Sequence, residues 1–531
     1  MKKKYTIILS MLAVLNASIF LILPYIAKFI VDEANSIYKN ANASYDKLNK
    51  YIIIMIVFGV LSFILRLLYN LLYSKFDLKL QKDLRNKLYE SLIRKDINII
   101  SKYHRGEIET LFVNDIDNVC EAYINAIPNI IRSISRVILA VILLILIGSA
   151  KYFLLPIVIL GLIMAVCAKL YSHFMKNKHK DVLVYDSYAS SFVIESIDEA
   201  KLIQSYNAYN NATSYYMGLN NKAYLKRRSR NRWTYASQAV VAGISTLIYV
   251  FMITLGAYLI AKNKISYGSL VALLAVLSNI YSPFVAISPL INKLNKGKAS
   301  MERISEIYCD KIDIDKNSLD DFLSIDIESL FYKYDDSDYI INNLNAHIKK
   351  GDTIRISGPS GIGKSTLLSL ILGFNKPNKG RIVFTTKEGK YEASYKTIGL
   401  FAYVSQENIL FSGSIYDNFK MFSNTSDIDV INNALKMANM LDEIASMPNG
   451  INTILSEKGK GLSMGQIQRI MIAIAIASNR PIILLDEPTS ALDKDNEEII
   501  INNLKSLNKT LIYITHRDFN ILNDSVIKME E

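Results

Sequence analysis

The chain is poor in the residues that build disulfide frameworks and zinc centres. Only three cysteines, Cys120, Cys167 and Cys309, occur among its 531 residues, and none belongs to a Cys-x-x-Cys pair or a Cys/His cluster. Its five histidines form no set with metal-ligand spacing. These absences argue against a disulfide scaffold and against a zinc site.

Acidic residues are in deficit as well, since 49 Asp and Glu stand against 61 Lys and Arg, for a formal net charge of +12. In a soluble protein this surplus would suggest a nucleic-acid partner. Here the basic residues lie largely between long apolar segments, and hydrophobic residues make up 51% of the chain. The sequence therefore predicts association with the lipid bilayer and no nucleic-acid partner.

Long apolar runs dominate the first half of the chain, and each is near the ~20 residues that a membrane helix needs. The first run follows Met1 and three lysines, and it is too long for a signal peptide and lacks a small-x-small cleavage site. We therefore expect it to be a membrane span with its N-terminus inside. The six expected spans are 5–30, 51–73, 124–149, 152–172, 236–261 and 267–291.

Lysines and arginines cluster in two long connections, which follow the second and fourth spans. By the positive-inside rule, both connections are cytoplasmic. Apolar residues recur in the first of them at helical spacing, as at Leu78, Leu84, Leu88 and Leu92. We expect the spans to continue into the cytoplasm as long helices.

Three arginines, Arg66, Arg132 and Arg136, fall within the second and third apolar runs, where a charge is costly. One interpretation is that their side chains snorkel to lipid phosphates. The other is that they line a cavity open to the cytoplasm and attract an anionic or amphipathic substrate. The residues alone leave both interpretations open.

The second half contains a glycine-rich segment, 358–366, that matches the phosphate-binding pattern G-x-x-x-x-G-K-[ST] between a strand-like and a helix-like run. Its glycines let successive backbone N–H groups face one anion, and the helix N-terminus adds partial positive charge. Lys364 can reach the β- and γ-phosphates and Ser365 can bind Mg²⁺. The predicted nucleotide-binding residues here are Gly358, Pro359, Ser360, Gly361, Ile362, Gly363, Lys364, Ser365 and Thr366.

A pair of acids, Asp486 and Glu487, ends the apolar strand-like run 482–485. An acid at this point of a phosphate-loop fold holds Mg²⁺, which makes Asp486 a candidate metal ligand. Glu487 is placed to polarise the attacking water.

Further motifs follow in a fixed order. They are Gln406 after the strand-like run 401–404, the segment Leu462-Ser-Met-Gly-Gln466, Ser490-Ala-Leu-Asp493, and His516 after the run 511–514. With the phosphate loop and the acid pair, they resemble the ATP-binding cassette (ABC) transporters over about 325–531. The segments 411–418 and 453–459 resemble the exporter branch, which argues against an importer. The membrane half resembles the same family more weakly, at 106–107, 114–115, 195–206 and 300–304.

The resemblance implies a role for each matching residue. Tyr334 stacks on adenine, Gln406 contacts Mg²⁺ and links it to the membrane domain, and His516 touches the γ-phosphate. Ser463, Gly465 and Gln466 belong to a signature that closes over ATP bound to a second subunit. The predicted catalytic residues are Glu487, His516, Gln406 and Lys364, and the predicted metal ligands are Ser365, Gln406 and Asp486.

The resemblance also implies a multidomain fold. An all-α domain with six transmembrane helices and long cytoplasmic helical loops is expected over 1–310, followed by a linker over 311–323. An α/β P-loop ATP-binding cassette with a helical subdomain is expected over 324–531.

The expected function is an ATPase coupled to transmembrane transport, with ATP and Mg²⁺ as cofactors. As a homodimer or a heterodimer with a second half-transporter, it would export an amphipathic cargo: a peptide, a lipid or a drug-like molecule. The expected location is the bacterial plasma membrane, crossed several times, with the cassette in the cytoplasm.

One departure keeps an alternative open. Met464 stands where the family usually has glycine in the signature. The alternative is a nucleotide-binding regulatory half of a heterodimeric transporter, with weak ATPase activity of its own.

Overall fold

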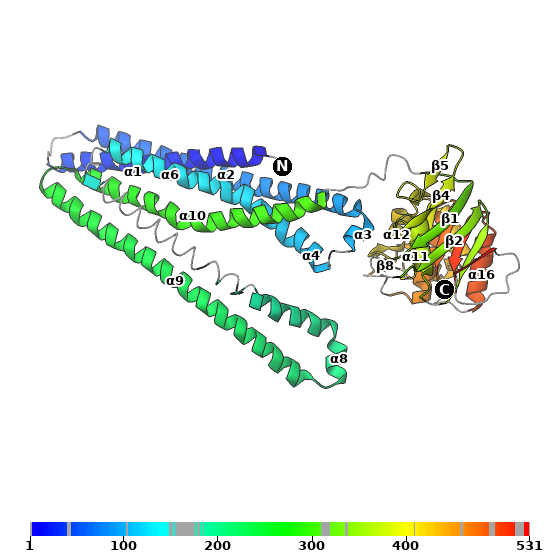
Figure 1. Ribbon diagram of the computed structural model, residues 1–531. Coiled ribbons are helices and arrows are strands. Elements are labelled where there is room, and N and C mark those ends of the chain that lie inside the picture. The colour runs from blue at the N-terminus through cyan, green and yellow to red at the C-terminus, as the bar shows by residue number, and fades with distance from the viewer. Residues whose placement is uncertain are drawn as a thin grey trace. The chain divides into compact units, whose positions relative to one another are not determined.

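The chain divides into two compact units in a computed structural model (Figure 1). The helical unit comprises residues 1–90 and 105–308, and the sheet-containing unit comprises residues 91–104 and 309–531. The structure describes residues 3–39, 44–101, 103, 105–147, 152–153, 175, 178, 181–182, 184–308, 319–334, 338–359, 361–407, 409–456, 459, 461–487, 494–515 and 525–529.

The helical unit consists of long helices and short connections. Its elements are α1 (Lys3–Lys39), α2 (Asp46–Ile93), α4 (Arg105–Thr110), η1 (Leu111–Asp115), α5 (Ile116–Cys120), η2 (Glu121–Ala126), α6 (Ile127–Leu146), α8 (Ala200–Ser205), α9 (Tyr209–Ala261) and α10 (Tyr267–Tyr308). The segments η1 and η2 are π-helical turns inside one continuous helix, which runs from Gly106 to Leu146.

Four helices in the described part of the chain are long and apolar enough to cross a membrane: Lys4–Lys39, Asp46–Ile93, Gly106–Leu146 and Tyr209–Ala261. They contain the predicted spans 5–30, 51–73 and 236–261 and nearly all of 124–149. The predicted span 267–291 lies in α10, and 152–172 lies almost wholly outside the described residues. A helical transmembrane domain is therefore confirmed, whereas the count of six spans stays a prediction.

The long helices α2 and α9, with 48 and 53 residues, far exceed the ~20 residues needed to span a bilayer. This agrees with the expected continuation of the spans beyond the membrane. In α2 none of the most apolar 18-residue stretch is buried within the chain. An exposed apolar face of this length suits contact with lipid tails or with another protein surface.

A core of apolar side chains joins α1, α6, α9 and α10. Leu21, Leu144, Met252 and Leu273 are all nearly inaccessible within it. At one end of the bundle, Asp32 of α1 accepts hydrogen bonds from the Ser266 hydroxyl (2.8 Å) and the Gly268 backbone N–H (2.9 Å). The carboxylate therefore caps the start of α10, where the N–H groups lack helical partners.

A buried carboxylate links η1 to α10. Asp115 is 1% exposed, accepts a hydrogen bond from the Ser300 hydroxyl (2.7 Å) and pairs with Arg303. A buried charge is tolerated when a partner and hydrogen bonds compensate its lost hydration. The pairing thus holds two helix segments together that are 185 residues apart in sequence.

The sheet-containing unit combines two main sheets with helices. An antiparallel sheet has the order β2-β1-β4-β5, a parallel sheet has the order β11-β3-β10-β9-β6, and β7 pairs with β8. The strands are β1 (Ser324–Tyr332), β2 (Ile341–Lys349), β3 (Thr353–Ser357), β4 (Lys379–Thr385), β5 (Lys390–Glu392), β6 (Phe401–Val404), β7 (Gly413–Ser414), β8 (Ile454–Leu455), β9 (Ile482–Asp486), β10 (Thr510–Ile514) and β11 (Ser525–Lys528).

The helices of this unit are α3 (Ile97–Ile100), α11 (Lys364–Ile371), η3 (Ile398–Leu400), α12 (Ile415–Phe422), α13 (Ile428–Met437), α14 (Leu441–Ala445), η4 (Gly450–Asn452), α15 (Met464–Ala477) and α16 (Lys494–Lys505). Every residue of β9 and β10 is buried, as expected for central parallel strands covered on both faces. The predicted α/β fold with a mostly parallel core is confirmed.

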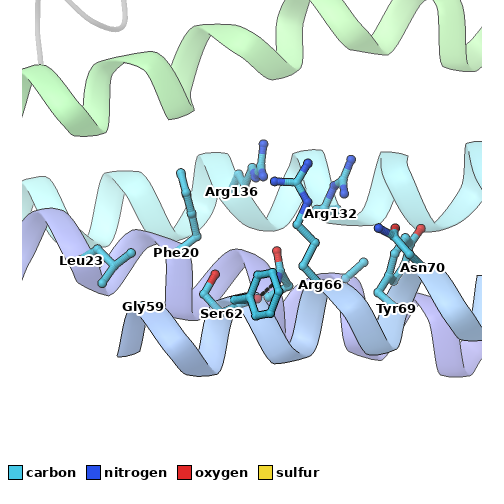
Figure 2. Close-up of a pocket in the computed structure, with 12 residues that line it drawn as sticks. Phe20, Leu23, Gly59, Ser62, Arg66, Tyr69, Asn70, Arg132 and Arg136 are labelled. Carbon is cyan, nitrogen blue, oxygen red and sulfur yellow. Dashed lines mark hydrogen bonds between the residues drawn. The ribbon is translucent and has the colours of Figure 1, made fainter. Parts of the chain in front are cut away.

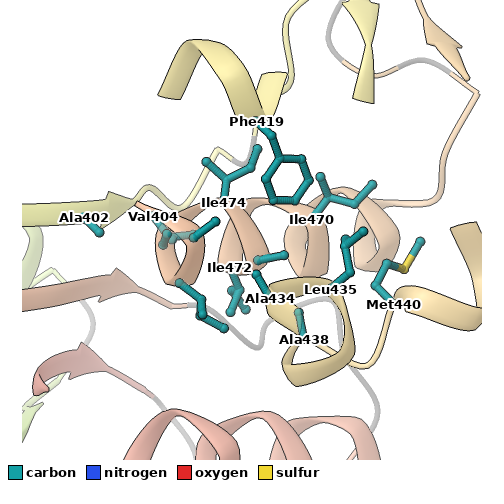
Figure 3. Close-up of a cluster of buried hydrophobic side chains, with 14 of the residues drawn as sticks. Ala402, Val404, Phe419, Ala434, Leu435, Ala438, Met440, Ile470, Ile472 and Ile474 are labelled. Atoms are coloured by element: carbon teal, nitrogen blue, oxygen red, sulfur yellow. The ribbon is translucent and has the colours of Figure 1, made fainter. Parts of the chain in front are cut away.

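The helical subdomain packs against the parallel sheet through one apolar cluster (Figure 3). Phe419 of α12, Leu435 of α13 and Ile470 of α15 belong to this cluster. Val404 of β6 belongs to it as well, on the side of the parallel sheet. All four are inaccessible to solvent. At about 25 cal/mol per Å² of buried apolar area, such a cluster is a main source of the stability of this unit.

Residues 91–104, from the first long connection, belong to the sheet-containing unit. Asp96 caps α3 by accepting a hydrogen bond from the Asn98 backbone N–H (2.8 Å). The Asn98 side chain then donates to the Phe374 carbonyl oxygen (2.7 Å). The predicted linker 311–323 lies mostly outside the described residues, and the predicted domain boundaries stay a prediction.

A close helix crossing gives a test of the bundle. A Cβ atom on Gly297 of α10 would overlap the Cβ atom of Ala122 and lie 2.7 Å from the Asn118 carbonyl oxygen. We expect Gly297→Ala to cost roughly 1–3 kcal/mol through overpacking, and so to lower the Tm of the purified protein in detergent.

The matched control is Gly218→Ala in α9, where a Cβ meets nothing within 4 Å. This control should raise stability by up to about 1 kcal/mol, because alanine favours the helix more than glycine does. Equal Tm changes in the two variants would contradict the close crossing.

Candidate functional site

The predicted site residues gather at the carboxyl edge of the parallel sheet. β10 pairs in parallel with β3 and β9, and β9 pairs with β6, so the four strands end at one edge. The phosphate loop follows β3, Asp486 ends β9 and Gln406 follows β6. Ligands of α/β folds bind at this edge of a sheet. His516, after β10, and Ser360, within the loop, lie outside the described residues.

The phosphate loop has the backbone that its glycines were expected to provide. Gly361 and Gly363 have φ of 83° and 99°, in the left-handed region that side chains disfavour. At Gly358 a Cβ would lie 2.8 Å from the Met529 carbonyl oxygen, so lack of space excludes a larger residue there. Gly363 then forms the N-terminal boundary of α11, whose first N–H groups can bind an anion.

The Lys364 side chain folds back onto the backbone of this loop. Its Nζ donates hydrogen bonds to the carbonyl oxygens of Gly358 and Pro359, each at 2.9 Å, and the residue is 6% exposed. The ammonium group is thus held by backbone carbonyl oxygens at the start of the loop. A cation at this position fits the negative charge of a triphosphate.

Ser365 and Asp486 form the oxygen cluster expected for Mg²⁺. The Ser365 hydroxyl donates to Asp486 Oδ1 at 3.3 Å, and Asp486 is 4% exposed. A hydroxyl and a carboxylate are ligands that Mg²⁺ accepts, together with phosphate and water oxygens. Among the described residues, no group of three His, Cys, Asp or Glu side chains could hold a metal by itself. The residues present therefore fit a cation that arrives with the nucleotide.

Burial shapes the chemistry of Asp486. Burial raises the pKa of this carboxyl and the charge of Glu487 adds to the rise, whereas Ser365 and Lys364 oppose it. The adjacent Tyr403 of β6 hydrogen-bonds the same carboxyl, and burial with the nearby negative charge raises the pKa of Tyr403 to about 12. A desolvated carboxylate with this environment would gain from a bound cation.

Glu487 is held by two amide side chains. Gln406 Nε2 donates to Glu487 Oε2 at 3.0 Å, and Gln468 Nε2 donates to the Glu487 carbonyl oxygen at 3.2 Å. Glu487 has φ of 50°, a conformation that non-glycine residues rarely adopt outside constrained sites. The turn after β9 therefore orients this carboxylate at the same edge as Lys364.

Two contributors to the site were not predicted from the sequence. Gln468 is fully buried in α15 and contacts Glu487, and Tyr403 contacts Asp486. The sequence signal was that Gln468, with Arg469, interrupts the apolar run from Ile467 to Ile474, because buried polar side chains need partners. For Tyr403 the sequence offers no such signal.

Tyr334 contacts the first turn of α11, the helix that follows the loop. Its hydroxyl is 3.2 Å from Thr366 Oγ1, and its ring packs edge-on against Tyr332 with centroids 5.0 Å apart. The residue is 48% exposed, so part of the ring surface is accessible for stacking with a planar base.

The signature segment forms the N-terminus of α15. The Ser463 side chain accepts a hydrogen bond from Gln466 N, and the Gln466 side chain accepts one from Ser463 N, which completes a capping box. The Gln466 amide also donates to Glu443 at 3.0 Å. The Gln466 side chain is thus engaged within its own chain, whereas Ser463 and Met464 are exposed and Gly465 is partly exposed.

The hydrogen bonds described for the side chains of Ser463 and Gln466 stay within the signature segment or reach Glu443. In the part of the chain that the structure describes, no hydrogen bond or ion pair connects Ser463, Gly465 or Gln466 with the residues of the loop.

Comparison with known proteins places both halves of the chain. The family model described as "ABC transporter transmembrane region" matches residues 6–284, and the one described as "ABC transporter" matches residues 341–490. The chain is 30% identical over 531 residues to a putative export ATP-binding/permease protein of Rickettsia felis, with 97% of this chain and 90% of that protein covered.

Two further proteins match this chain over most of its length. The multidrug resistance-like ATP-binding protein MdlA of Buchnera aphidicola subsp. Baizongia pistaciae is 26% identical over 484 residues, with 90% of this chain and 83% of that protein covered. A bacterial Atm1-family ABC exporter solved with ATP bound is 19% identical, with a TM-score of 0.81, and 99% of this chain and 93% of that chain are covered. The last comparison shows a shared fold.

The environment of Asp486 gives a pH-dependent prediction. Because its pKa is raised on folding, the stability that this group contributes is present in acid, below its unfolded pKa near 3.8, and is lost as the pH rises through the raised value. Asp486→Asn removes the charge and should raise the Tm at pH 8, and the gain should shrink toward pH 4.

Thermal unfolding of the nucleotide-free, magnesium-free protein across this pH range measures the effect. The exposed residue Asp320 provides the control, because Asp320→Asn should change Tm little at any pH. A lower Tm for Asp486→Asn at pH 8 would contradict the desolvated environment.

Proposed function

Because this chain belongs to the ABC transporter family, with a transmembrane region and an ATP-binding domain in one polypeptide, we propose that it works as one half of a dimeric exporter. It is a multi-pass membrane protein and an ATPase coupled to transport. The observation that carries the proposal is the exposed signature at the start of α15, which no hydrogen bond or ion pair joins to the phosphate loop in the described residues. In this proposal a second subunit completes each of them.

In this proposal the nucleotide binds along the carboxyl edge of the parallel sheet. Tyr334 stacks on adenine, and the N–H groups of the loop and of α11 bind the phosphates. Lys364 exchanges the carbonyl oxygens of Gly358 and Pro359 for phosphate oxygens, which is supported by its position inside the loop.

Hydrolysis is assigned to the groups beside Asp486. Ser365, Gln406 and Asp486 would hold Mg²⁺, which when bound neutralises charge on the phosphates. Glu487 would orient and polarise the attacking water, and the Gln406 amide would keep that carboxylate in place. His516 keeps its proposed contact with the γ-phosphate.

The second subunit would supply Ser463 and Gly465 of its own signature segment, at the exposed N-terminus of a 14-residue helix. The Gln466 side chain, engaged by Ser463 and Glu443, would position that helix start and would not contact the phosphates directly. The partner can be a second copy of this chain or a different half-transporter. ATP would close the two cassettes, and hydrolysis would reopen them.

The proposed location is the bacterial plasma membrane, with the cassette in the cytoplasm. The basic residues of the two long connections support this orientation. The proposed cargo is amphipathic. A relative named as multidrug resistance-like supports a drug-like cargo, while peptides and lipids are compatible with the same membrane domain.

Met464 favours one alternative. It is 57% exposed at the first position of α15, where its side chain would face the other subunit's nucleotide. A bulky residue there could weaken closure, which would make this chain the regulatory half of a heterodimer with little ATPase activity of its own.

The ATPase test uses the purified full chain in nanodiscs. We expect magnesium-dependent ATP hydrolysis, and we expect Glu487→Gln to lower kcat by about 10²–10³, because a positioned general base contributes on that order. The matched control is Glu388→Gln, in an exposed turn between β4 and β5, which should hydrolyse ATP at the wild-type rate.

The outcomes separate the two proposals. Full activity in Glu487→Gln would contradict the role of Glu487. A wild-type chain that is inactive alone, and gains activity only with a second half-transporter, would support the regulatory alternative.

A further inference from the structure

The helical unit contains a cavity that the ATPase chemistry does not use. It has a volume of about 620 Å³ and lies between α1, α2 and α6 (Figure 2). A hydrogen bond from the Asn16 side chain to the Ser62 carbonyl oxygen (3.3 Å) joins α1 to α2 along its wall. The volume is within the range of about 300–1,000 Å³ that is typical of small-molecule sites.

Three arginines line this cavity together. Arg132 and Arg136 are four residues apart on α6 and so share one helix face, and Arg66 comes from α2. Figure 2 shows their guanidinium groups directed into the same space between the helices. Three residues that lie in two separate apolar runs of the sequence therefore form one basic site.

The positive charge of this site has no compensation in the described part of the chain. No Asp or Glu lines the cavity, and none of the three arginines makes an ion pair there. The Nε of Arg136 is buried without a hydrogen-bond partner, and its guanidinium lies 5.8 Å from the Phe20 ring centroid. A charge within an apolar membrane span is costly, and the like charges also repel one another.

Asp115 differs from the cavity arginines, which lack an acidic partner among the described residues. That buried charge has Arg303 and Ser300 as partners from the same unit. Arg66 is exposed and Arg132 and Arg136 are partly exposed, so their guanidinium groups are accessible to an anion from outside the chain.

The cavity lining is more polar on one side of Arg66 than on the other. Tyr69 and Asn70 lie on one side of Arg66, and Phe20, Leu23 and Gly59 lie on the other (Figure 2). A molecule that fits this lining has an anionic head for the guanidinium groups and an apolar part for Phe20 and Leu23. Guanidinium groups favour carboxylates and phosphates, because they bind both oxygens at once.

We propose that this cavity binds the carboxylate or phosphate head of an anionic amphipathic molecule, and that such molecules are the cargo class of the transporter. The assignment of the ligand as cargo rests on the proposed export function. An anionic bilayer lipid presents the same chemistry, so the experiment contains an arm that separates the two sources.

Binding is measured on the full chain in nanodiscs of phosphatidylcholine, which carries no net charge. The probe is dansyl-undecanoic acid, whose emission rises in an apolar site, and its neutral amide is the matched probe. Signals from empty nanodiscs are subtracted. We expect the acid to bind about tenfold more tightly than the amide, equivalent to roughly 1.4 kcal/mol.

The variants test the three arginines. The combined change Arg66→Gln, Arg132→Gln and Arg136→Gln should remove the preference for the acid, whereas lysine at the same positions should retain part of it. Arg228→Gln, at an exposed position of α9 outside the cavity, should keep the wild-type preference. If the combined glutamine variant does not fold, Arg132→Gln alone should still reduce the preference relative to Arg132→Lys.

The lipid arm repeats the measurement in nanodiscs that contain phosphatidylglycerol, with ATP hydrolysis as a second readout. Cargo binding predicts that the acid still binds and stimulates wild-type ATPase activity more than the amide does. Displacement of the acid by phosphatidylglycerol, without stimulation, would assign the cavity to a bilayer lipid and overturn the cargo proposal.

Failure of this inference can be separated from failure of the proposed function. Wild-type ATPase activity that Glu487→Gln abolishes supports the proposed function by itself. If that activity is present while acid and amide bind equally, or while the glutamine variant keeps the preference, the anion site alone is overturned.

Discussion

The parallel pairing of β3, β10, β9 and β6 is the constraint on which the nucleotide site depends. Parallel strands end at one edge of a sheet, and the residues that follow them therefore meet there although they are far apart in sequence. The pairing brings Ser365 within hydrogen-bond distance of Asp486, 121 residues away, and Gln406 within reach of Glu487, 81 residues away. The fully buried side chains of β9 and β10 hold this arrangement by apolar contacts on both faces.

Three charged sites in the chain differ in whether the chain itself supplies a partner of opposite charge. Asp115 is buried with Arg303 and Ser300 as partners, so its charge is compensated within the chain. Asp486 is buried beside only a hydroxyl, a phenol and a more distant ammonium group, an environment that favours a bound cation. The arginines of the α1–α2–α6 cavity have no described anionic partner, which favours a bound anion. The buried Asp486 and the partly exposed arginine cluster are thus two sites where a ligand can supply the missing opposite charge.

Much of the site was predictable because its motifs are local. The phosphate loop needs glycine at positions of positive φ next to a helix start, and this requirement appears within nine consecutive residues. The acid pair after an apolar strand is equally local. By contrast, Gln468 and Tyr403 contribute through contacts across the fold, which no spacing along the chain encodes. The Gln466 side chain, expected at the nucleotide, is occupied by the capping box and Glu443, because the start of α15 needs its own N–H groups satisfied.

The sequence by itself determined the two-part fold, the family and the order of the nucleotide motifs, because apolar runs, helical periodicity and glycine-rich turns are properties of short segments. Only the tertiary structure decided that residues 91–104 belong to the sheet-containing unit and that Glu487 is held by Gln406 and Gln468. It also decided that Arg66, Arg132 and Arg136 line one cavity, where the sequence left both snorkelling and a substrate site open. The reason is geometric: residues on different helices share a cavity only when packing fixes the rotation of each helix about its own axis.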